Sequence, residues 1–357
     1  MRFKKGIFVL LAVFCLSGIS CSSLDTKYKP VYKYTDDNGK EIYDWPAGSE
    51  TGMIDVHGGK VAYRIYGKDK PGVPIIFVHG GPGGTYNYLY KQLCLAEDRP
   101  VVLYDQLGSC LSEISPEFQT EEKVKTLFTI DRYCDELNSV VNYFNFKNFV
   151  LGGYSWGCML ELEYAAKYNP SGLKGIVFIG PFLNVDTWLK DAERLIKSLD
   201  GGDEMWQEVV QCESSHNYTD RYNQINEIYS QNFTDRHKQD SFDKPNMNNE
   251  DVFSPKIAGV DVYDYMWGNS EFVCTGTLQH HDSTPLLNKI KVPVLYISGQ
   301  YDSGTPQAAF DYCSKTPNGE VAVIPGAAHH TYMERPNEFN VILTEYLKRI
   351  EGAQNHE

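Results

Sequence analysis

The sequence predicts an α/β protein whose mostly parallel sheet is covered by helices on both faces. Along most of the chain, short apolar runs rich in β-branched residues alternate with stretches of helical periodicity. This alternation is typical of parallel strands joined by helical crossovers. A stretch rich in asparagine, aspartate, tyrosine and glutamine interrupts the rhythm over residues 182–287. We interpret it as an inserted subdomain with helical segments.

The strands and helices are expected in a regular order. The runs Met53–Val56 and Val61–Tyr66 flank Gly58-Gly59, and this pattern predicts a β-hairpin. Further short apolar runs predict strands at 73–78, 101–104, 149–151, 175–179, 292–297 and 321–324. Apolar residues at helical spacing predict helices at 86–95, 130–146, 159–168, 185–199, 307–313 and 337–350.

The chain has 357 residues, a length compatible with one large domain or two ordinary ones. Because the strand–helix rhythm resumes after the insertion, we expect one core built from two parts. The expected division is a leader at 1–20, a polar arm at 21–51, core at 52–181, insertion at 182–287, core at 288–352 and a tail at 353–357.

Composition excludes several classes of protein. Lysine and arginine total 33 against 47 acidic residues, which gives a net charge of −14. Such an acidic excess argues against a nucleic-acid partner, since a phosphate backbone requires a basic face. Nine cysteines are too sparse for a disulfide scaffold in a chain of this length.

The first residues predict a secretory signal. Arg2, Lys4 and Lys5 precede an apolar run over residues 6–19, which is shorter than the roughly 20 residues that span a bilayer. Gly18 and Ser20 suit an ordinary signal peptidase. Gly18-Ile19-Ser20-Cys21 also resembles the lipobox of bacterial lipoproteins, in which Cys21 is lipidated. We therefore expect an exported protein, either anchored to a membrane at the periplasm or cell surface or released in soluble form.

A candidate nucleophile lies between a predicted strand and a predicted helix. Gly153-Tyr154-Ser155-Trp156-Gly157 has the G-x-S-x-G pattern of a nucleophile elbow, in which a strained turn exposes the serine. Glycines two residues to either side avoid a clash in that turn. The following helix directs its N-terminal dipole toward charge that develops near Ser155.

A serine hydroxyl needs a base and an orienting acid to become a nucleophile. In this strand–turn–helix context the acid and the histidine follow the serine in the chain, each after a strand. Asp302 follows the strand predicted at 292–297, and His329 and His330 follow the one at 321–324. The position relative to the turn favours His329. The second histidine pair, His280-His281, is interpreted as a surface feature rather than a metal site.

A glycine-rich loop follows the strand predicted at 73–78. In His79-Gly80-Gly81-Pro82-Gly83-Gly84, small residues let a backbone N–H approach a substrate carbonyl. One donor from this loop and the N–H of Trp156 would form an oxyanion hole. A phosphate-binding loop is the alternative, but the sequence lacks the G-K-[ST] ending of a P-loop.

Three of these motifs together resemble the proline iminopeptidase family of α/β-hydrolases. They are His79–Gly83, Tyr104–Ser109 and Gly153–Gly157, and the resemblance extends over roughly residues 52–350. It implies the α/β-hydrolase fold with the insertion as a helical cap, and it implies no metal or cofactor. The implied catalytic residues are Ser155, Asp302 and His329, with oxyanion donors at Gly81 and Trp156 and a substrate contact at Gly80.

The cap segment Trp267–Phe272 resembles the family segment whose glutamate binds the free N-terminus of the substrate, which implies this role for Glu271. A buried ammonium group needs a carboxylate partner to offset its desolvation. The alternative is a surface glutamate on the cap. The chain departs from some relatives at Ser303, where they carry a second glutamate, and at Cys110-Leu111 and Cys158.

The favoured hypothesis is an exported serine aminopeptidase that releases an N-terminal residue, with proline as the family expectation. Its substrates would be short peptides or other small molecules with a free amine. A second hypothesis is hydrolysis of esters or amino-acid amides, and blocking the substrate amine distinguishes the two. A third is a binding lipoprotein on an inactive scaffold. The intact set of Ser155, Asp302, His329 and the glycine-rich loop argues against it.

Overall fold

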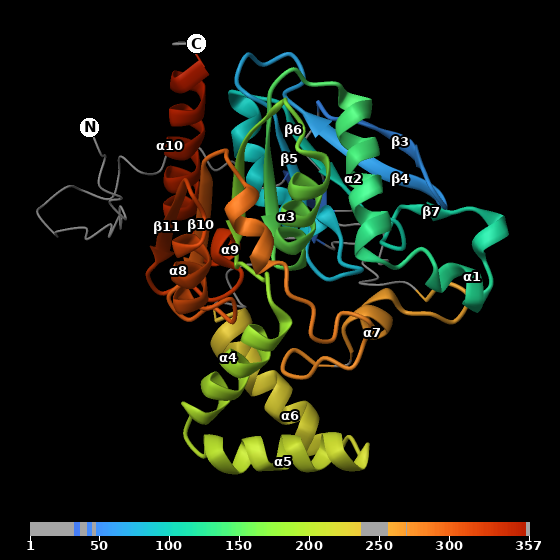
Figure 1. The fold of residues 1–357 in the computed structure, drawn as a ribbon, viewed down its shortest axis with the longest axis vertical. Helices are drawn as coiled ribbons and strands as arrows, with labels where there is room; N and C mark the ends of the chain where they lie inside the picture. The colour runs from blue at the N-terminus through green and yellow to red at the C-terminus, as the bar shows by residue number, and fades with distance from the viewer. Residues whose placement is uncertain (1–31, 36–40, 45–47, 237–255, 269, 355–357) are drawn as a thin grey trace, which may run out of the picture.

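A computed structural model describes residues 32–35, 41–44, 48–236, 256–268 and 270–354. Within them, a nine-stranded sheet has the order β11-β10-β9-β8-β5-β6-β4-β3, with β7 paired to β4 (Figure 1). Its strands are β3 (Glu50–Val56), β4 (Gly59–Tyr66), β5 (Ile75–Val78), β6 (Val101–Tyr104), β7 (Glu113–Ile114), β8 (Phe149–Tyr154), β9 (Leu173–Ile179), β10 (Val294–Gly299) and β11 (Gly319–Ile324). A separate hairpin joins β1 (Tyr32–Thr35) to β2 (Glu41–Asp44).

Most of the sheet is parallel. The neighbours from β11 to β6 pair in parallel, and β4 joins β6, β3 and β7 in antiparallel register. Every residue of β5, β6 and β8 is buried, as strands covered on both faces require. The prediction of a mostly parallel sheet is therefore confirmed. Because the strands run in parallel, the loops after β5, β8, β10 and β11 emerge at the same edge.

Helices cover both faces of the sheet, and each face has its own apolar core. One core holds α2 (Ile130–Phe144), α3 (Trp156–Tyr168) and α8 (Pro306–Ser314). The other holds the 3₁₀-helix η2 (Tyr86–Glu97), α9 (Thr331–Glu334) and α10 (Pro336–Gln354). Successive residues of β5 alternate between them, with Ile76 and Val78 in the first core and Ile75 and Phe77 in the second. The short elements η3 (Pro116–Phe118) and α1 (Glu121–Lys125) precede α2.

The predicted and observed helices differ in their bounds, and two of these differences have clear local reasons. The helix expected at 130–146 ends at Phe144, because Asn145 adopts a left-handed conformation with φ of 49°. The helix expected at 86–95 is instead a 3₁₀-helix that extends to Glu97. The Thr85 side chain caps its start by accepting a hydrogen bond from the N–H of Asn87.

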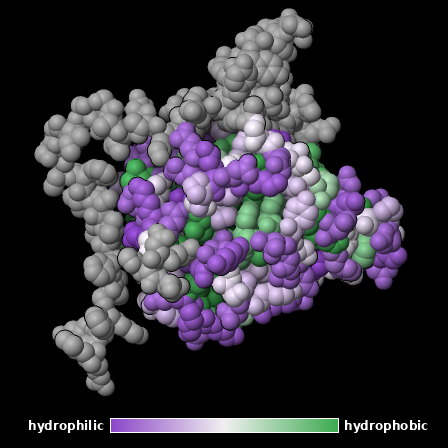
Figure 2. All heavy atoms as spheres, turned by 90° about the horizontal axis from the view of Figure 1, so that it is seen from above, coloured by the Kyte–Doolittle hydropathy of each residue, from purple (hydrophilic) through white to green (hydrophobic). Residues whose placement is uncertain are grey.

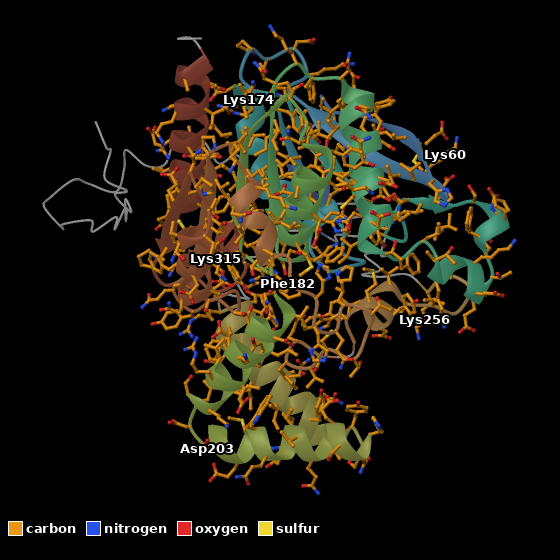
Figure 3. All side chains as sticks on the ribbon, viewed as in Figure 1. Lys60, Lys174, Phe182, Asp203, Lys256 and Lys315 are labelled. Carbon is orange, nitrogen blue, oxygen red and sulfur yellow. The ribbon has the colours of Figure 1, made fainter. Side chains whose placement is uncertain are left out.

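The insertion between β9 and β10 is mainly helical in its described part, as expected. It contains α4 (Val185–Lys197), α5 (Gly202–Ser215), α6 (Asp220–Tyr229), the π-helical turn η4 (Ser230–Thr234), α7 (Val262–Met266) and the 3₁₀-helix η5 (Thr284–Lys289). Helices α4, α5 and α6 project below the sheet in Figure 1 and enclose a small apolar core of their own. Figure 3 shows Phe182 where the chain leaves the sheet and Asp203 near the far end of the cap.

The entry and exit of the cap lie against each other. Asn184 and Asp282 form an isolated antiparallel bridge, and the N–H of Val185 donates to the carbonyl of His281. The chain segment that enters the cap and the one that leaves it therefore run side by side in opposite directions. This pairing fixes the base of the cap on the sheet.

The described residues include the predicted core boundaries but not the predicted leader. The predicted leader and Cys21 lie outside the described residues. The sheet begins at Glu50, and α10 ends at Gln354. None of the helices in the described part of the chain is long and apolar enough to span a membrane.

The face opposite the cap carries mostly hydrophilic side chains around a narrower band of hydrophobic ones (Figure 2).

Candidate active site

The turn between β8 and α3 holds Ser155 in a strained conformation. Its φ of 54° and ψ of −117° place it outside the regions that most residues adopt. A Cβ on Gly157 would lie 2.2 Å from the carbonyl oxygen of Val78 in β5, and one on Gly153 would lie 2.6 Å from the backbone of Gly157. The turn therefore requires glycine at both positions, as the G-x-S-x-G pattern predicts.

Asp302 and His329 lie together although 27 residues separate them in the chain. The Nδ1 of His329 is 2.6 Å from Oδ1 of Asp302, and the two side chains are almost fully buried. The carboxylate also accepts hydrogen bonds from the N–H groups of Gly299 (3.0 Å) and Gly304 (2.7 Å). These bonds fix the carboxylate, so Nδ1 carries the ring proton and Nε2 is left as the basic nitrogen.

Ser155 and His329 line the same cavity, which has a volume of about 300 Å³. The predicted residues Gly80, Gly81 and Glu271 line it as well. The rest of the lining consists of other glycine-loop, aromatic and polar side chains: His79, Gly84, Thr85, Tyr88, Leu89, Tyr154, Thr234, Tyr263 and His330. Residues of the core and residues of the cap thus line the same cavity.

Of the two adjacent histidines, only His329 is placed against Asp302 among the described contacts. His330 lines the cavity from another direction, and its ring stacks on Tyr154 with centroids 5.7 Å apart. Tyr154 also packs against the ring of His329 at 4.8 Å. The arrangement agrees with the preference for His329 over His330.

The glycine-rich loop after β5 approaches the nucleophile turn closely. A Cβ on Gly80 would lie 2.9 Å from the ring of Tyr154 and 3.2 Å from Cβ of Ser155. Gly81 has a φ of 119°, which favours glycine. Trp156 is the first residue of α3, where a backbone N–H has no acceptor within the helix. Both proposed oxyanion donors therefore flank Ser155.

The cap contributes Glu271 to the cavity. Its Oε1 accepts a hydrogen bond of 2.6 Å from the hydroxyl of Tyr263, and the indole of Trp188 donates to its backbone carbonyl at 2.9 Å. Burial and the charge of Glu271 raise the pKa of Tyr263 well above its usual value, so this hydroxyl stays protonated and donates. Glu271 thus faces the cavity and is not on the outer surface of the cap.

Backbone groups of the cap bind both the acid loop and the base loop. The carbonyl of Phe233 in η4 accepts hydrogen bonds from the N–H of Ser303 (3.0 Å) and the N–H of His329 (3.2 Å). The next carbonyl, of Thr234, accepts from the N–H of His330 at 3.1 Å. Sequence reasoning missed this contact, because a main-chain carbonyl carries no residue-type signal.

The departures from the family pattern are accommodated. Ser303 is buried beneath the cap beside Phe233. Cys158 is fully buried and directs its thiol to the carbonyl of Gly153 at 3.2 Å, where it acts as a small packing residue. Cys110 is half-buried and has a φ of 26°, in the left-handed region that favours glycine. Burial raises the pKa of Cys158 well above its usual value, so the thiol is unreactive.

The pair His280-His281 binds carboxylates at the base of the cap. His280 lies 2.9 Å from Asp186, and His281 lies 2.9 Å from Glu163. Within the described part of the chain, no three His, Cys, Asp or Glu side chains are grouped as metal ligands. Both imidazoles therefore join the exit of the cap to neighbouring helices.

Several known proteins are similar to this chain in sequence and fold. The family described as the alpha/beta hydrolase fold matches residues 73–336. The chain is 32% identical over 303 residues to a proline iminopeptidase of Heyndrickxia coagulans, across 84% of this chain and 99% of that protein. It is 30% identical over 294 residues to a proline iminopeptidase of Clostridium botulinum, across 81% of this chain and 95% of that protein. The crystal structure of a proline iminopeptidase of Mycobacterium smegmatis matches this structure with a TM-score of 0.73 and 25% sequence identity. The match covers 85% of this chain and 100% of that one. The predicted α/β-hydrolase fold is confirmed.

The contact between Gly180 and His329 gives a test of this geometry. A Cβ on Gly180 would lie 2.6 Å from Nδ1 and Cε1 of the His329 ring, so Gly180→Ala should displace the imidazole. Labelling of Ser155 by a fluorophosphonate should then slow by about a hundredfold. The matched control is Gly201→Ala, because Gly201 also has a positive φ (70°) but has no neighbouring atom within 4 Å. Equal labelling rates in the two variants would contradict the placement of His329.

Proposed function

Because the chain belongs to the proline iminopeptidase family of α/β-hydrolases, we propose that it is a serine aminopeptidase that releases the N-terminal residue of short peptides. Proline is the expected residue, since the relatives described above are proline iminopeptidases. The observation that carries the proposal is the presence of Ser155, His329 and Glu271 around one cavity. They offer a nucleophile, a base and a carboxylate for the free amine of the substrate.

Ser155 is proposed to attack the scissile carbonyl while Nε2 of His329 takes its proton. Asp302 holds the ring through the 2.6 Å contact at Nδ1 and stabilises the imidazolium that forms. The imidazolium then gives the proton to the leaving amine, and the N-terminal residue stays on Ser155 as an ester. Water, deprotonated by His329, hydrolyses this ester and releases the free amino acid.

The negative oxygen of the tetrahedral intermediate needs hydrogen-bond donors that are already in place. The N–H groups of Gly81 and Trp156 are proposed to supply them, because they come from the two loops that flank Ser155. The N-terminal dipole of α3 adds to this stabilisation. Gly80 supports the same site, since its lack of a side chain lets the loop pack against the nucleophile turn.

Glu271 is proposed to bind the ammonium group of the substrate. A charge-assisted hydrogen bond of this kind is worth more than a neutral one and offsets desolvation of the amine. Tyr263 fixes the carboxylate by donating to Oε1, which leaves acceptor capacity for the substrate. Because Glu271 is anchored to the cap, it sets a fixed distance between the amine and Ser155. Such a distance selects the first residue of a peptide.

Export is a further part of the proposal. It is supported by the basic start and apolar run of residues 1–20, and lipid attachment is supported by the sequence that ends at Cys21. Removal of the leader deletes Arg2, Lys4 and Lys5 and no acid, and so takes the net charge from −14 to −17. The mature enzyme would then act on peptides outside the cytoplasm.

The Ser155→Ala variant tests the mechanism. Hydrolysis of a proline arylamide should fall by at least about 10⁴-fold, because no other group on the turn can form the acyl-enzyme. The wild-type rate should be unaffected by a metal chelator. Thermal unfolding of the variant serves as the control for folding. Residual turnover near the wild-type rate in a folded variant would refute the serine mechanism.

The Glu271→Gln variant tests amine recognition. For a free-amine proline arylamide, KM should rise by about tenfold or more, because the ammonium group loses its charged partner. For an ester without an amine, KM and kcat should not change. Tyr263→Phe is the matched control, since it removes the hydroxyl from Oε1 but keeps the carboxylate, and its effect should be smaller. Equal turnover of free and N-acetylated substrates by the wild type would instead favour the ester or amide hydrolase.

The Cys21→Ala variant tests the membrane anchor. After expression of the full chain in a bacterium, the wild type should be recovered in the membrane fraction, and the variant should be soluble outside the cytoplasm. Cys15→Ala is the control, because Cys15 lies within the predicted leader and is removed with it. A wild-type protein whose mature N-terminus is not residue 21, as determined by mass spectrometry, would exclude lipidation at Cys21.

A further inference from the structure

A third loop lies beside the two that carry the proposed oxyanion donors. It follows β6, the strand beside β5, and contains Gln106, whose side chain is 1% exposed. The mechanism above gives this residue no task. A buried primary amide has two donor hydrogens and one acceptor oxygen that need partners, so its position in the core requires specific contacts.

Each end of the Gln106 amide binds a different donor loop. Its Nε2 donates to the carbonyl of His79 at 2.9 Å, and its Oε1 accepts from the indole N–H of Trp156 at 2.9 Å. His79 begins the loop that contains Gly81, and Trp156 itself carries the second proposed donor. A single side chain thus connects the two halves of the oxyanion hole.

The main chain of Gln106 adds a third contact, which also defines the state of His79. The N–H of Gln106 donates to Nε2 of His79 at 2.9 Å. Because this backbone group can only donate, Nε2 is unprotonated and the ring proton is on Nδ1, which lies 2.8 Å from the carbonyl of Gly80. Burial lowers the pKa of His79 to about 4, so the ring is neutral at ordinary pH.

We propose that Gln106 is a positioning residue that sets the spacing between the Gly81 and Trp156 N–H groups. This inference rests on the proposed acyl-enzyme mechanism. The glycines at 80, 81, 83 and 84 leave Pro82 as the one side chain between His79 and Thr85, so polar contacts help to hold this loop in position. Gln106 supplies such contacts from a loop whose described residues are not among those that line the cavity.

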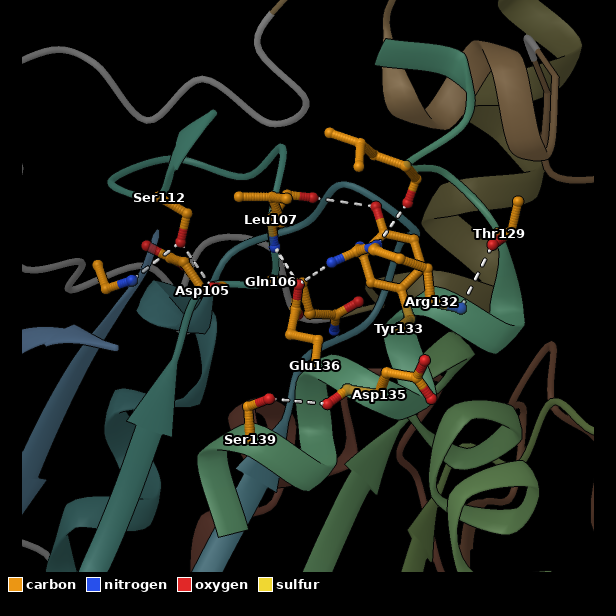
Figure 4. Close-up of polar contacts among 12 residues, drawn as sticks. Asp105, Gln106, Leu107, Ser112, Thr129, Arg132, Tyr133, Asp135, Glu136 and Ser139 are labelled. Atoms are coloured by element: carbon orange, nitrogen blue, oxygen red, sulfur yellow. Dashed lines mark hydrogen bonds and ion pairs between the residues drawn. The ribbon is translucent and has the colours of Figure 1, made fainter. Parts of the chain in front are cut away.

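The loop that carries Gln106 is held by hydrogen bonds on both sides, and Figure 4 shows those that join Leu107 to Glu136 and Glu136 to Arg132. On one side, the buried Asp105 accepts a hydrogen bond from the hydroxyl of Thr85 at 2.8 Å. On the other, the N–H of Leu107 donates to Glu136 at 3.1 Å, and Glu136 is paired with the buried Arg132. These fixed neighbours let the Gln106 amide transmit its position to both donor loops.

The contact with Trp156 controls the orientation of the whole residue. The indole is fully buried and packs edge-on against Tyr133 at 6.0 Å, while its N–H is held by Gln106. Because the indole is held by Tyr133 at its ring and by Gln106 at its N–H, it restrains the Cα of Trp156 and the peptide that carries the donor N–H at the start of α3. Loss of the amide should therefore affect the geometry of the donor as well as that of the loop.

The Gln106→Met variant tests the inference, because it keeps the length of the side chain and removes its hydrogen bonds. We expect kcat for a proline arylamide to fall about tenfold with KM nearly unchanged, since the donors act mainly in the transition state. Affinity for a prolyl boronic acid, which forms a tetrahedral adduct on Ser155, should fall by a similar factor. Inhibition by free proline, which forms no such adduct, should not change.

Tyr346→Phe is the control for general loss of stability. Its hydroxyl makes buried hydrogen bonds with the carbonyls of Ile176 and Pro293, in contacts that do not involve the cavity. This variant should lower Tm and leave kcat unchanged. If Gln106→Met keeps wild-type kcat and boronate affinity, the inference is wrong. If the wild type itself cleaves no amino-acyl arylamide, the proposed function is wrong instead, so the two failures are distinguishable.

The Gln106→Glu variant provides a second readout that a purely structural role would not produce. An ionised carboxylate can accept from Trp156 but cannot donate to the carbonyl of His79, whereas a protonated one can do both. The ratio of variant to wild-type kcat should therefore rise as pH falls and the carboxyl group becomes protonated. A ratio independent of pH would overturn the inference even if Gln106→Met did not fold.

Discussion

The close backbone contact beneath Ser155 is the constraint on which the rest of the site depends. At Gly157, helix α3 approaches the carbonyl of Val78 so closely that a methyl group would overlap it at 2.2 Å. This approach brings the end of β5, the end of β8 and the start of α3 to one point. The strain at Ser155 is maintained because the buried strands on either side leave the turn no room to relax. Packing of the main chain therefore brings the nucleophile turn against the glycine-rich loop.

The acid and the base depend on a second constraint, which comes from the cap. The carbonyl of Phe233 accepts hydrogen bonds from both Ser303 and His329, and Thr234 does the same for His330. A rigid movement of η4 away from the core would leave these N–H groups without their acceptors, at a cost of about 1–3 kcal/mol for each one that stays buried. The cap is thus a structural part of the catalytic geometry as well as a wall of the cavity.

Much of the core could be predicted from the sequence because its signals are local. Buried β-branched runs, helical spacing and the glycine pattern around Ser155 each occupy a short window, and the structure contains the corresponding elements. The proximity of Asp302 and His329 could be predicted because each follows a strand of the parallel sheet. The amide of Gln106 and the carbonyl of Phe233 could not be assigned in this way. Their partners are distant in sequence, and such pairings depend on the three-dimensional arrangement of loops.

The amine site shows how the two constraints combine. The core fixes Ser155, while the cap fixes Glu271 through Tyr263 and Trp188. The distance between Glu271 and Ser155 is therefore set by the docking of the cap on the core, which η4 secures. With Ser303 in place of a second glutamate, Glu271 is the one carboxylate among the described residues that line the cavity. On the proposed function, selectivity for a free N-terminus would depend on the position of this cap side chain, and that position is determined by hydrogen bonds within the cap.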